Sequence, residues 1–144
     1  TYVEKDGSKV RPVMLHRVIF GSIERFIGIL IEHFAGHFPV WLAPQQVSVV
    51  PVHHEKHLEY ANEVNEKLLA LGYRSKLDAR NEKLGYRIRE AQLSKIPYQL
   101  VIGDGEIENG SVTLRRAQSK ESLTMPLEDF IAMMNSAVEE KTLS

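Results

Sequence analysis

The stretch from residue 47 to residue 52 reads VSVVPV, a largely apolar run with polar residues on both sides. A strand that is apolar along its length, rather than at alternate positions, is typical of a central strand covered on both faces of its sheet. A second apolar run, YQLVIG, occupies residues 98–103. Two such strands in one chain favour an α/β fold, in which helices pack on both sides of the sheet.

The residues between these strands predict two helices, because apolar residues recur there at helical spacing. The first helix covers residues 58–71 and ends at Gly72, a residue suited to the end of a helix. The second covers about residues 84–91 and is stopped by Pro97, and a strand with basic residues at alternate positions, 73–79, lies between the two helices. The apolar positions are Leu58, Ala61, Val64, Leu68 and Leu71 in the first helix and Leu84, Ile88 and Ala91 in the second.

The residues after the second apolar strand complete the fold. Residues 104–110 are polar and predict a turn, and two further strands are expected at 111–120 and 122–125. Pro126 begins the last helix. Its apolar stripe consists of Leu127, Phe130, Ile131, Met134 and Val138. This order predicts a mixed five-stranded sheet, mostly parallel in its first half, with helices on both faces.

The N-terminal residues follow another pattern. Residues 2–19 predict a hairpin that turns at Asp6-Gly7-Ser8, and residues 23–34 predict a helix with Ser22 as its N-cap. The sequence AGHFP at 35–39 breaks this helix.

We therefore place a domain boundary near residue 40, with one unit at 1–38 and a second at 39–144. The chain has no initial methionine, and Thr1-Tyr2-Val3 resembles the middle of a strand, so we expect a piece of a longer protein.

The composition excludes several classes of protein. The chain has 144 residues, 43% hydrophobic and 26% charged, which suits an ordinary globular domain. It has no cysteine, so it has neither disulfides nor thiolate metal ligands, and this composition is compatible with a cytoplasmic location. The longest apolar run, at 26–31, falls far short of the roughly 20 residues that span a membrane, so no membrane partner is expected.

The net charge of −1 conceals an uneven distribution of charge. Residues 73–96 carry seven basic and three acidic residues, whereas residues 121–144 carry five acidic residues and one lysine. Arg80 and Lys83 flank the start of the second helix, and Arg87 follows Lys83 one turn later. Such a basic face attracts the phosphates of a nucleic acid, although most charged faces are only solvated, and the charges alone leave both interpretations open.

Two longer stretches resemble a known family. Residues 11–33, RPVMLHRVIFGSIERFIGILIEH, resemble motif 3 of the class II aminoacyl-tRNA synthetases, where a strand leads through a glycine into a helix that bears an arginine. The sequence from Met14 onward resembles the threonyl-tRNA synthetases in particular. Residues 77–97, LDARNEKLGYRIREAQLSKIP, are similar to the anticodon-binding domain of the same family. The resemblance covers essentially the whole chain.

The resemblance implies a parent enzyme that activates threonine with ATP and transfers it to the 3′ end of its tRNA. It implies ATP and zinc in the parent, tRNA(Thr), threonine and ATP as partners, a homodimer, a cytoplasmic location and no DNA. In these terms residues 1–38 are the end of the catalytic domain, and residues 39–144 are the anticodon-binding domain. This portion alone is expected to be inactive and to hold no complete cofactor site.

The resemblance also assigns roles to residues near the N-terminus. It implies that Arg25 is catalytic and, with Ser22, binds ATP, since a guanidinium can neutralise phosphate charge. It matches His16 to one zinc ligand, whose partners, a cysteine and a second histidine, would lie upstream. If the resemblance is set aside, the simpler interpretation is that Ser22 is a plain N-cap, Arg25 a surface arginine and His16 an ordinary histidine.

Three further residues are implied to read the anticodon: Asn81, Glu106 and Arg115. Unstacked bases expose their edges to such side chains, because an amide both donates and accepts, a carboxylate accepts and a guanidinium bridges base and phosphate. The alternatives are a helix N-cap for Asn81, a turn acid for Glu106 and an exposed strand residue for Arg115. The nearby histidines 53, 54 and 57 are more simply a solvated helix start than a metal site.

Two other functions remain in view. A standalone tRNA-binding or regulatory paralogue is disfavoured by an intact motif 3 within 1–38. A small nucleotide- or metabolite-binding domain is disfavoured because no glycine-rich phosphate loop follows Val52 or Gly103.

Since residues 1–38 lack their catalytic sheet, we expect them to be disordered, packed on the second domain or buried against another copy. The family assignment itself expects Arg25 beside the edge of such a sheet.

Overall fold

The computed structural model describes residues 1–119 and 121–143. Its centre is a five-stranded sheet in the order β4-β3-β5-β6-β7. Strand β3 is parallel to both β4 and β5, whereas β6 pairs antiparallel with β5 and β7. The strands are β3 (Val47–Pro51), β4 (Ser75–Leu77), β5 (Tyr98–Ile102), β6 (Ser111–Arg116) and β7 (Ser122–Pro126). The predicted mixed sheet, parallel in its first half, is confirmed.

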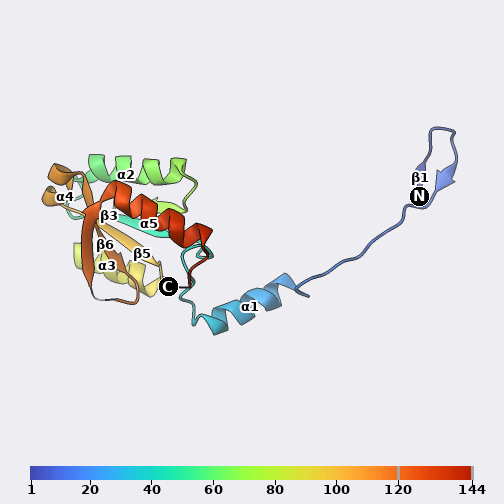
Figure 1. Ribbon diagram of the computed structural model, residues 1–144, viewed down its shortest axis with the longest axis horizontal. Helices are drawn as coiled ribbons and strands as arrows, with labels where there is room; N and C mark the ends of the chain where they lie inside the picture. Colours follow the sequence, from blue (N-terminus) through green and yellow to red (C-terminus); the bar gives the residue numbers. More distant parts are fainter. Residues whose placement is uncertain (120, 144) are drawn as a thin grey trace.

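Helices cover both faces of the sheet (Figure 1). On one face, α2 and α5 enclose the core, whose largest fully buried apolar side chains include Phe130, Leu68 and Leu100. Burying a side chain of this size stabilises the fold by about 1.5–3 kcal/mol. On the other face, α3 packs against β3. The helices are α2 (Leu58–Ala70), α3 (Leu84–Leu93), α4 (Asp104–Asn109) and α5 (Leu127–Glu139).

Several expected elements of the domain differ from the observed ones. The strand expected at 111–120 is the shorter β6, which ends at Arg116, and residue 120 lies outside the described residues. The polar turn expected at 104–110 is the helix α4, because the Glu106 carboxylate accepts from the Gly103 N–H at 2.8 Å and so caps the first turn. Gly110 ends this helix in the left-handed conformation, with φ of 59°. The strand expected at 73–79 is shorter, since only residues 75–77 pair with β3.

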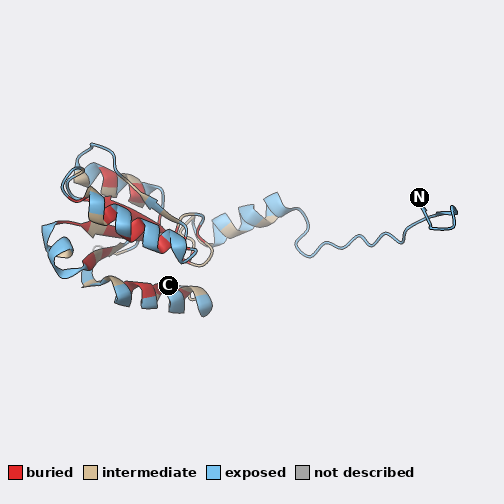
Figure 2. Cartoon of the chain, turned by 90° about the horizontal axis from the view of Figure 1, so that it is seen from above, coloured by how far each residue is buried: buried red, intermediate tan, exposed pale blue. Residues whose placement is uncertain are grey.

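The N-terminal segment up to the end of α1 extends away from this domain (Figure 1). The expected hairpin is wrong in its extent: β1 (Tyr2–Val3) pairs with β2 (Lys9–Val10), and residues 11–18 belong to no strand. Helix α1 (Ile23–His33) forms as expected, and the Ser22 Oγ accepts from the Arg25 N–H at 3.3 Å. None of its residues is buried, and Figure 2 shows the segment mostly exposed, with a few residues of intermediate exposure. Within the described residues, α1 therefore does not pack on the second domain.

The first buried residues of the chain are Pro39 and Val40, which belong to the domain and not to α1. The link that follows is held by the side chains of Gln46 and Arg74, which precede β3 and β4. Gln46 Nε2 donates to the Val40 carbonyl at 2.9 Å, and Arg74 donates to the carbonyls of Ala43 and Trp41 at 2.8 and 2.9 Å. These bonds attach the link to the start of β3. In the parts of the chain that the structure describes, no helix is long and apolar enough to cross a membrane.

Candidate nucleic-acid interface

The parallel strands β3, β4 and β5 end at one edge of the sheet, so the segments that follow them lie along that edge. These segments are residues 52–57 after β3, residues 78–83 after β4, and α4 after β5. Asn81 is in the second segment and Glu106 is in α4. The topology therefore brings two of the expected anticodon residues to the same edge, as is common for binding sites of open α/β sheets.

Glu106 is held by hydrogen bonds to both of its carboxylate oxygens. Oε2 accepts from the Gly103 N–H at 2.8 Å, and Oε1 accepts from the Thr113 Oγ1 at 2.6 Å. Burial raises the pKa of Glu106, but these two bonds outweigh it, and the pKa lies below its ordinary value. The side chain is thus an ionised, fixed acceptor on a helix, and each oxygen keeps further accepting capacity.

Arg115 shares a surface with this carboxylate. Side chains alternate along β6, and because Val112 and Leu114 belong to the core, Thr113 and Arg115 lie on the opposite face. The Thr113 hydroxyl also contacts the Thr124 hydroxyl of β7 at 2.7 Å. A continuous polar surface therefore runs from Glu106 through Thr113 toward Arg115, which is partly buried rather than an exposed strand residue.

Asn81 lies in the loop between β4 and α3 and is exposed. It is not the N-cap of α3, because that position is Lys83, which makes no side-chain capping bond. Among the described residues the Asn81 side chain makes no hydrogen bond, so its amide faces solvent. The structure places Asn81 at the same edge as Glu106, but no hydrogen bond links their side chains.

Arg87 does not belong to the expected basic face. It is 1% exposed, and its guanidinium donates to the carbonyls of Pro51, Asp78 and Glu82 at 2.7, 2.9 and 3.1 Å. The charge is therefore turned inward, where it satisfies carbonyls at the end of β3 and in the Asn81 loop. Arg87 cannot contact a nucleic acid, and its role is to fix the loop that carries Asn81.

Arg80 is exposed but already paired. Its guanidinium makes a two-pronged contact with Asp78, at 2.8 and 2.7 Å, and a contact with Glu90 at 2.6 Å. The hydrogen bond from Arg80 holds the pKa of Asp78 below its usual range and, in return, raises the pKa of Arg80. Lys83 is exposed without an ion pair in the described part of the chain. Of the three expected basic residues, Lys83 alone presents an uncompensated charge.

The histidine cluster also differs from expectation. His57 is 3% exposed rather than solvated: its Nδ1 accepts from the His53 N–H at 3.1 Å, and its Nε2 lies 3.1 Å from the Asp104 carboxylate. Because Nδ1 accepts, Nε2 carries the proton and donates to Asp104, at the start of α4. His57 thus attaches the loop after β3 to the helix that carries Glu106.

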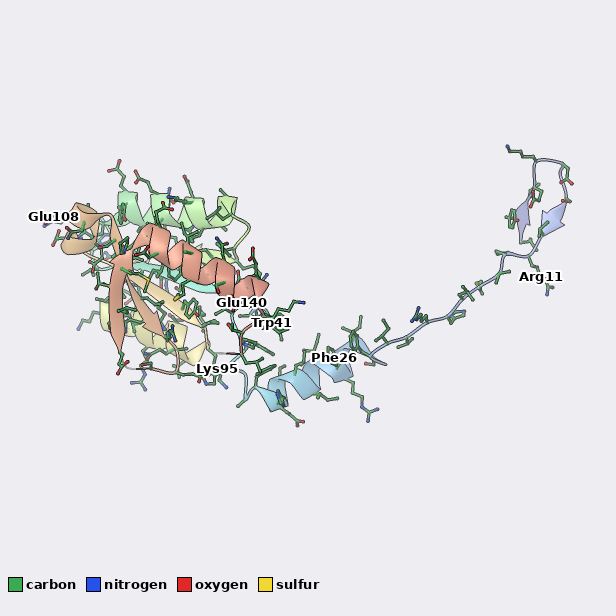
Figure 3. All side chains as sticks on the ribbon, in the orientation of Figure 1. Arg11, Phe26, Trp41, Lys95, Glu108 and Glu140 are labelled. Carbon is green, nitrogen blue, oxygen red and sulfur yellow. The ribbon has the colours of Figure 1, made fainter. Side chains whose placement is uncertain are left out.

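The N-terminal site residues are not brought together. Ser22 and Arg25 are exposed on α1, and no sheet edge lies beside them within residues 1–119 and 121–143. Figure 3 shows that Arg11 and α1, which bears Phe26, lie away from the domain, and the Phe26 ring stacks on Phe20 of the same segment. His16 is exposed as well, and the described residues contain no cluster of three or more potential metal ligands. The residues present do not make a zinc site.

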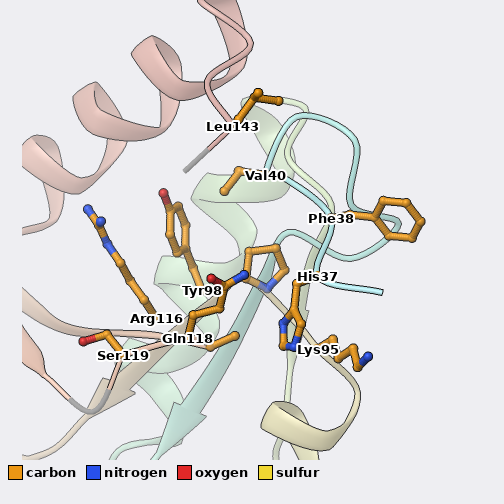
Figure 4. Close-up of a pocket in the computed structure, with 11 residues that line it drawn as sticks. His37, Phe38, Val40, Lys95, Tyr98, Arg116, Gln118, Ser119 and Leu143 are labelled. Carbon is orange, nitrogen blue, oxygen red and sulfur yellow. The ribbon is translucent and has the colours of Figure 1, made fainter. Parts of the chain in front are cut away.

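A cavity of about 240 Å³ lies at the other end of β5 (Figure 4). Tyr98, the first residue of β5, forms one wall, and the guanidinium carbon of Arg116 is 6.0 Å from the centroid of the Tyr98 ring. His37 and Val40 of the link contribute the facing wall. This cavity is remote from the edge that carries Glu106 and Asn81, so it is not part of the polar surface.

Sequence reasoning missed three features of the interface. Gln99, which pairs across the strands with Arg115, was part of an apolar run, and the bond between His57 and Asp104 joins residues far apart in the chain. Tyr86 is 55% exposed on α3, one turn after Lys83. An aromatic residue within the basic run was the available signal for Tyr86, because bases stack on exposed aromatic rings.

The sequence of the chain is similar to a known family of domains and to a group of enzymes. Residues 46–136 match the family model described as anticodon binding domain. The chain is 56% identical, over 99% of its length, to a threonine–tRNA ligase of Desulforamulus reducens, and 52% identical, over 97%, to one of Listeria monocytogenes. It spans only 22% of each of these curated relatives.

Solved structures of tRNA synthetases have a similar fold. The RNA-binding domain of threonyl-tRNA synthetase from Cryptosporidium parvum matches with a TM-score of 0.76 and 32% identity, over 81% of this chain and 29% of that one. A prolyl-tRNA synthetase of the same organism, with a TM-score of 0.62 and 24% identity over 71% of this chain and 22% of that one, shares the fold. These matches exclude the small metabolite-binding domain and give no support to a standalone paralogue.

Proposed function

The chain belongs to the anticodon-binding domains, of the kind found in threonyl-tRNA synthetases, and from this premise we propose that it reads the anticodon of a threonine tRNA. The observation that supports this proposal most directly is the fixed, ionised carboxylate of Glu106 on the same polar surface as Arg115. A carboxylate with spare accepting capacity suits the donor groups on the edge of a guanine.

In this proposal the three anticodon residues have distinct roles. Glu106 accepts from the central guanine of the anticodon, and because it is already held by two bonds, little conformational entropy is lost on binding. Arg115 donates to a neighbouring base or phosphate. Asn81, on its anchored loop, offers both a donor and an acceptor. Lys83 contributes attraction for phosphate that does not depend on sequence.

The proposal extends to the parent enzyme. We propose that the chain works as the C-terminal part of a longer threonine–tRNA ligase, which uses ATP and threonine as a cytoplasmic homodimer. The length of the relatives and their names support the longer ligase that uses threonine and ATP; the homodimer and the cytoplasmic location come from the family resemblance alone. Residues 1–38 then complete a catalytic sheet in the parent, where Arg25 and Ser22 contact ATP. ATP would supply the adenylyl group that activates the threonine carboxylate, with pyrophosphate as the leaving group, and Arg25 would neutralise negative charge on its phosphates. His16 would join zinc only with ligands from elsewhere in the parent.

The test uses the 144-residue chain and two RNA stem-loops. One carries the anticodon of a threonine tRNA and the other has its central G replaced. We expect the chain to prefer the first, and Glu106→Gln to reduce that preference by about tenfold, the effect of one hydrogen bond to a charged group. Glu108→Gln, an exposed acid on the same helix, is the matched control and should change nothing. Equal binding of both stem-loops by the unaltered chain would overturn the proposed function.

A further inference from the structure

Gln99 is a polar residue in an otherwise apolar strand, and it is wholly buried. Its exposure is 0%, and within the described part of the chain neither its Oε1 nor its Nε2 has a hydrogen-bond partner. A buried amide without partners destabilises a fold, and an apolar side chain of the same shape would avoid that cost. Burial therefore does not explain why glutamine occupies this position.

The neighbour of Gln99 across the strands is Arg115. The register of β5 and β6 pairs these two residues directly, so their Cβ atoms lie about 4.5–5.5 Å apart on the same face. The Nε of Arg115 is also buried and without a partner among the described residues. An unused acceptor thus lies beside an unused donor, at the residue to which we assign base contact.

We propose that Gln99 is a positioning residue for Arg115, a proposal that rests on the anticodon-reading function above. When an anticodon nucleotide engages the outer nitrogens of Arg115, its Nε–H donates to Gln99 Oε1. That bond fixes the plane of the guanidinium and directs its remaining donors outward, toward base or phosphate. The partner of this surface is therefore a single-stranded nucleotide whose acceptor edge lies in the plane that Gln99 sets.

The geometry explains why neither neighbour substitutes for Gln99. The same row across the sheet places Ser48 on β3 and Ser122 on β7, next to Gln99 and Arg115 respectively. Both serines are short, and their hydroxyls extend less far from the strand than the glutamine amide. Gln99 therefore combines an acceptor, sufficient length and the cross-strand position that faces Arg115.

The test replaces Gln99 by Met, which keeps the shape without the acceptor, and by Glu, which restores an acceptor. Binding of the threonine anticodon stem-loop is measured by fluorescence anisotropy, and stability by chemical unfolding. We expect Gln99→Met to weaken binding about five- to tenfold, the effect of one hydrogen bond, without lowering the unfolding midpoint. Gln99→Glu should retain most of the affinity. In an Arg115→Ala background, Gln99→Met should have no further effect on binding.

The outcomes separate this inference from the proposed function. If the unaltered chain fails to distinguish the two stem-loops, the proposed function fails. If it distinguishes them but Gln99→Met binds as tightly as the unaltered chain, or weakens binding equally in the Arg115→Ala background, the positioning role alone is overturned. A fall in both stability and binding for Gln99→Met, with no recovery in Gln99→Glu, would identify a purely structural residue and also overturn it.

Discussion

Helices α1 and α5 have similar sequence patterns and opposite surroundings. Both carry an apolar stripe at helical spacing, yet Ile23 and Ile27 of α1 are 69% and 47% exposed, whereas Phe130 and Met134 of α5 are both 0% exposed. An amphipathic pattern specifies that a helix has a face to bury, but it does not specify the partner. Since α1 has eleven residues and no buried side chain, local hydrogen bonds and its Ser22 cap are its main support, and isolated helices of this length are marginal in water.

The largest expected difference in stability between the two regions comes from replacing one phenylalanine in each region. Phe130→Ala should lower the free energy of unfolding by about 3–5 kcal/mol, because it leaves a cavity in a closely packed core. Phe20→Ala removes a ring that is 62% exposed and stacked on Phe26, and should leave the same transition unchanged. Chemical denaturation followed by circular dichroism measures both. A comparable loss for Phe20→Ala would mean that the N-terminal region packs on the domain.

A smaller contrast is expected between two arginines. Arg87→Met should cost about 2–3 kcal/mol of stability, because it leaves backbone carbonyls at the end of β3 and in the Asn81 loop without donors. Arg25→Met, on exposed α1, should cost nothing measurable in the same unfolding experiment. Arg87→Met should also weaken stem-loop binding by displacing Asn81. If Arg87→Met loses binding while its stability is unchanged, Arg87 contacts the RNA directly, contrary to its inward orientation.

The dependence of stability on pH should also differ between the two regions. The folded pKa of Glu106 is lowered, so its stabilisation is present above the ordinary glutamate pKa and is lost as the pH falls through the folded value. Glu24 of α1 also has a lowered pKa, through its bond from the Ser22 hydroxyl, but it is exposed. Acid titration of domain stability should therefore be less steep in Glu106→Gln and unchanged in Glu24→Gln. Identical titrations for Glu106→Gln and the unaltered chain would contradict the prediction.

The sequence predicted the domain well where local pattern and burial agree. The run at 47–52 is buried from Val47 to Pro51, as its apolar length indicated, and Gly72 follows α2 with φ of 85°, as a helix end requires. It predicted poorly where side chains decide the outcome over long separations. The inward turn of Arg87 depends on carbonyls contributed by two other segments, one of them 36 residues earlier in the chain.

The candidate site shows the same division. The resemblance gave Glu106 and Arg115, and the structure adds the reason why they can act together, namely the alternation of β6 and the hydroxyl of Thr113. The pairing of Arg80 with Asp78 and Glu90 was not predicted, because charge counts do not show which charges neutralise each other in space. Gln99 was hidden because an apolar run gives no sign that one of its members faces an arginine.

The smallest expected effect tests whether α1 is energetically separate from the domain. Gly28 in α1 and Gly85 in α3 both have open space where a Cβ would lie, so alanine fits at either position. Alanine favours a helix over glycine by about 0.5–1 kcal/mol, with the smaller value expected in a first turn such as that of Gly85. Because α3 unfolds with the domain, Gly85→Ala should raise the unfolding midpoint. Gly28→Ala should increase helical circular dichroism and leave that midpoint where it is, since no residue of α1 is buried and stabilising this helix therefore does not stabilise the core. A raised midpoint for Gly28→Ala would show that the two regions unfold together, and the contrast between α1 and α5 would then be one of exposure but not of cooperativity.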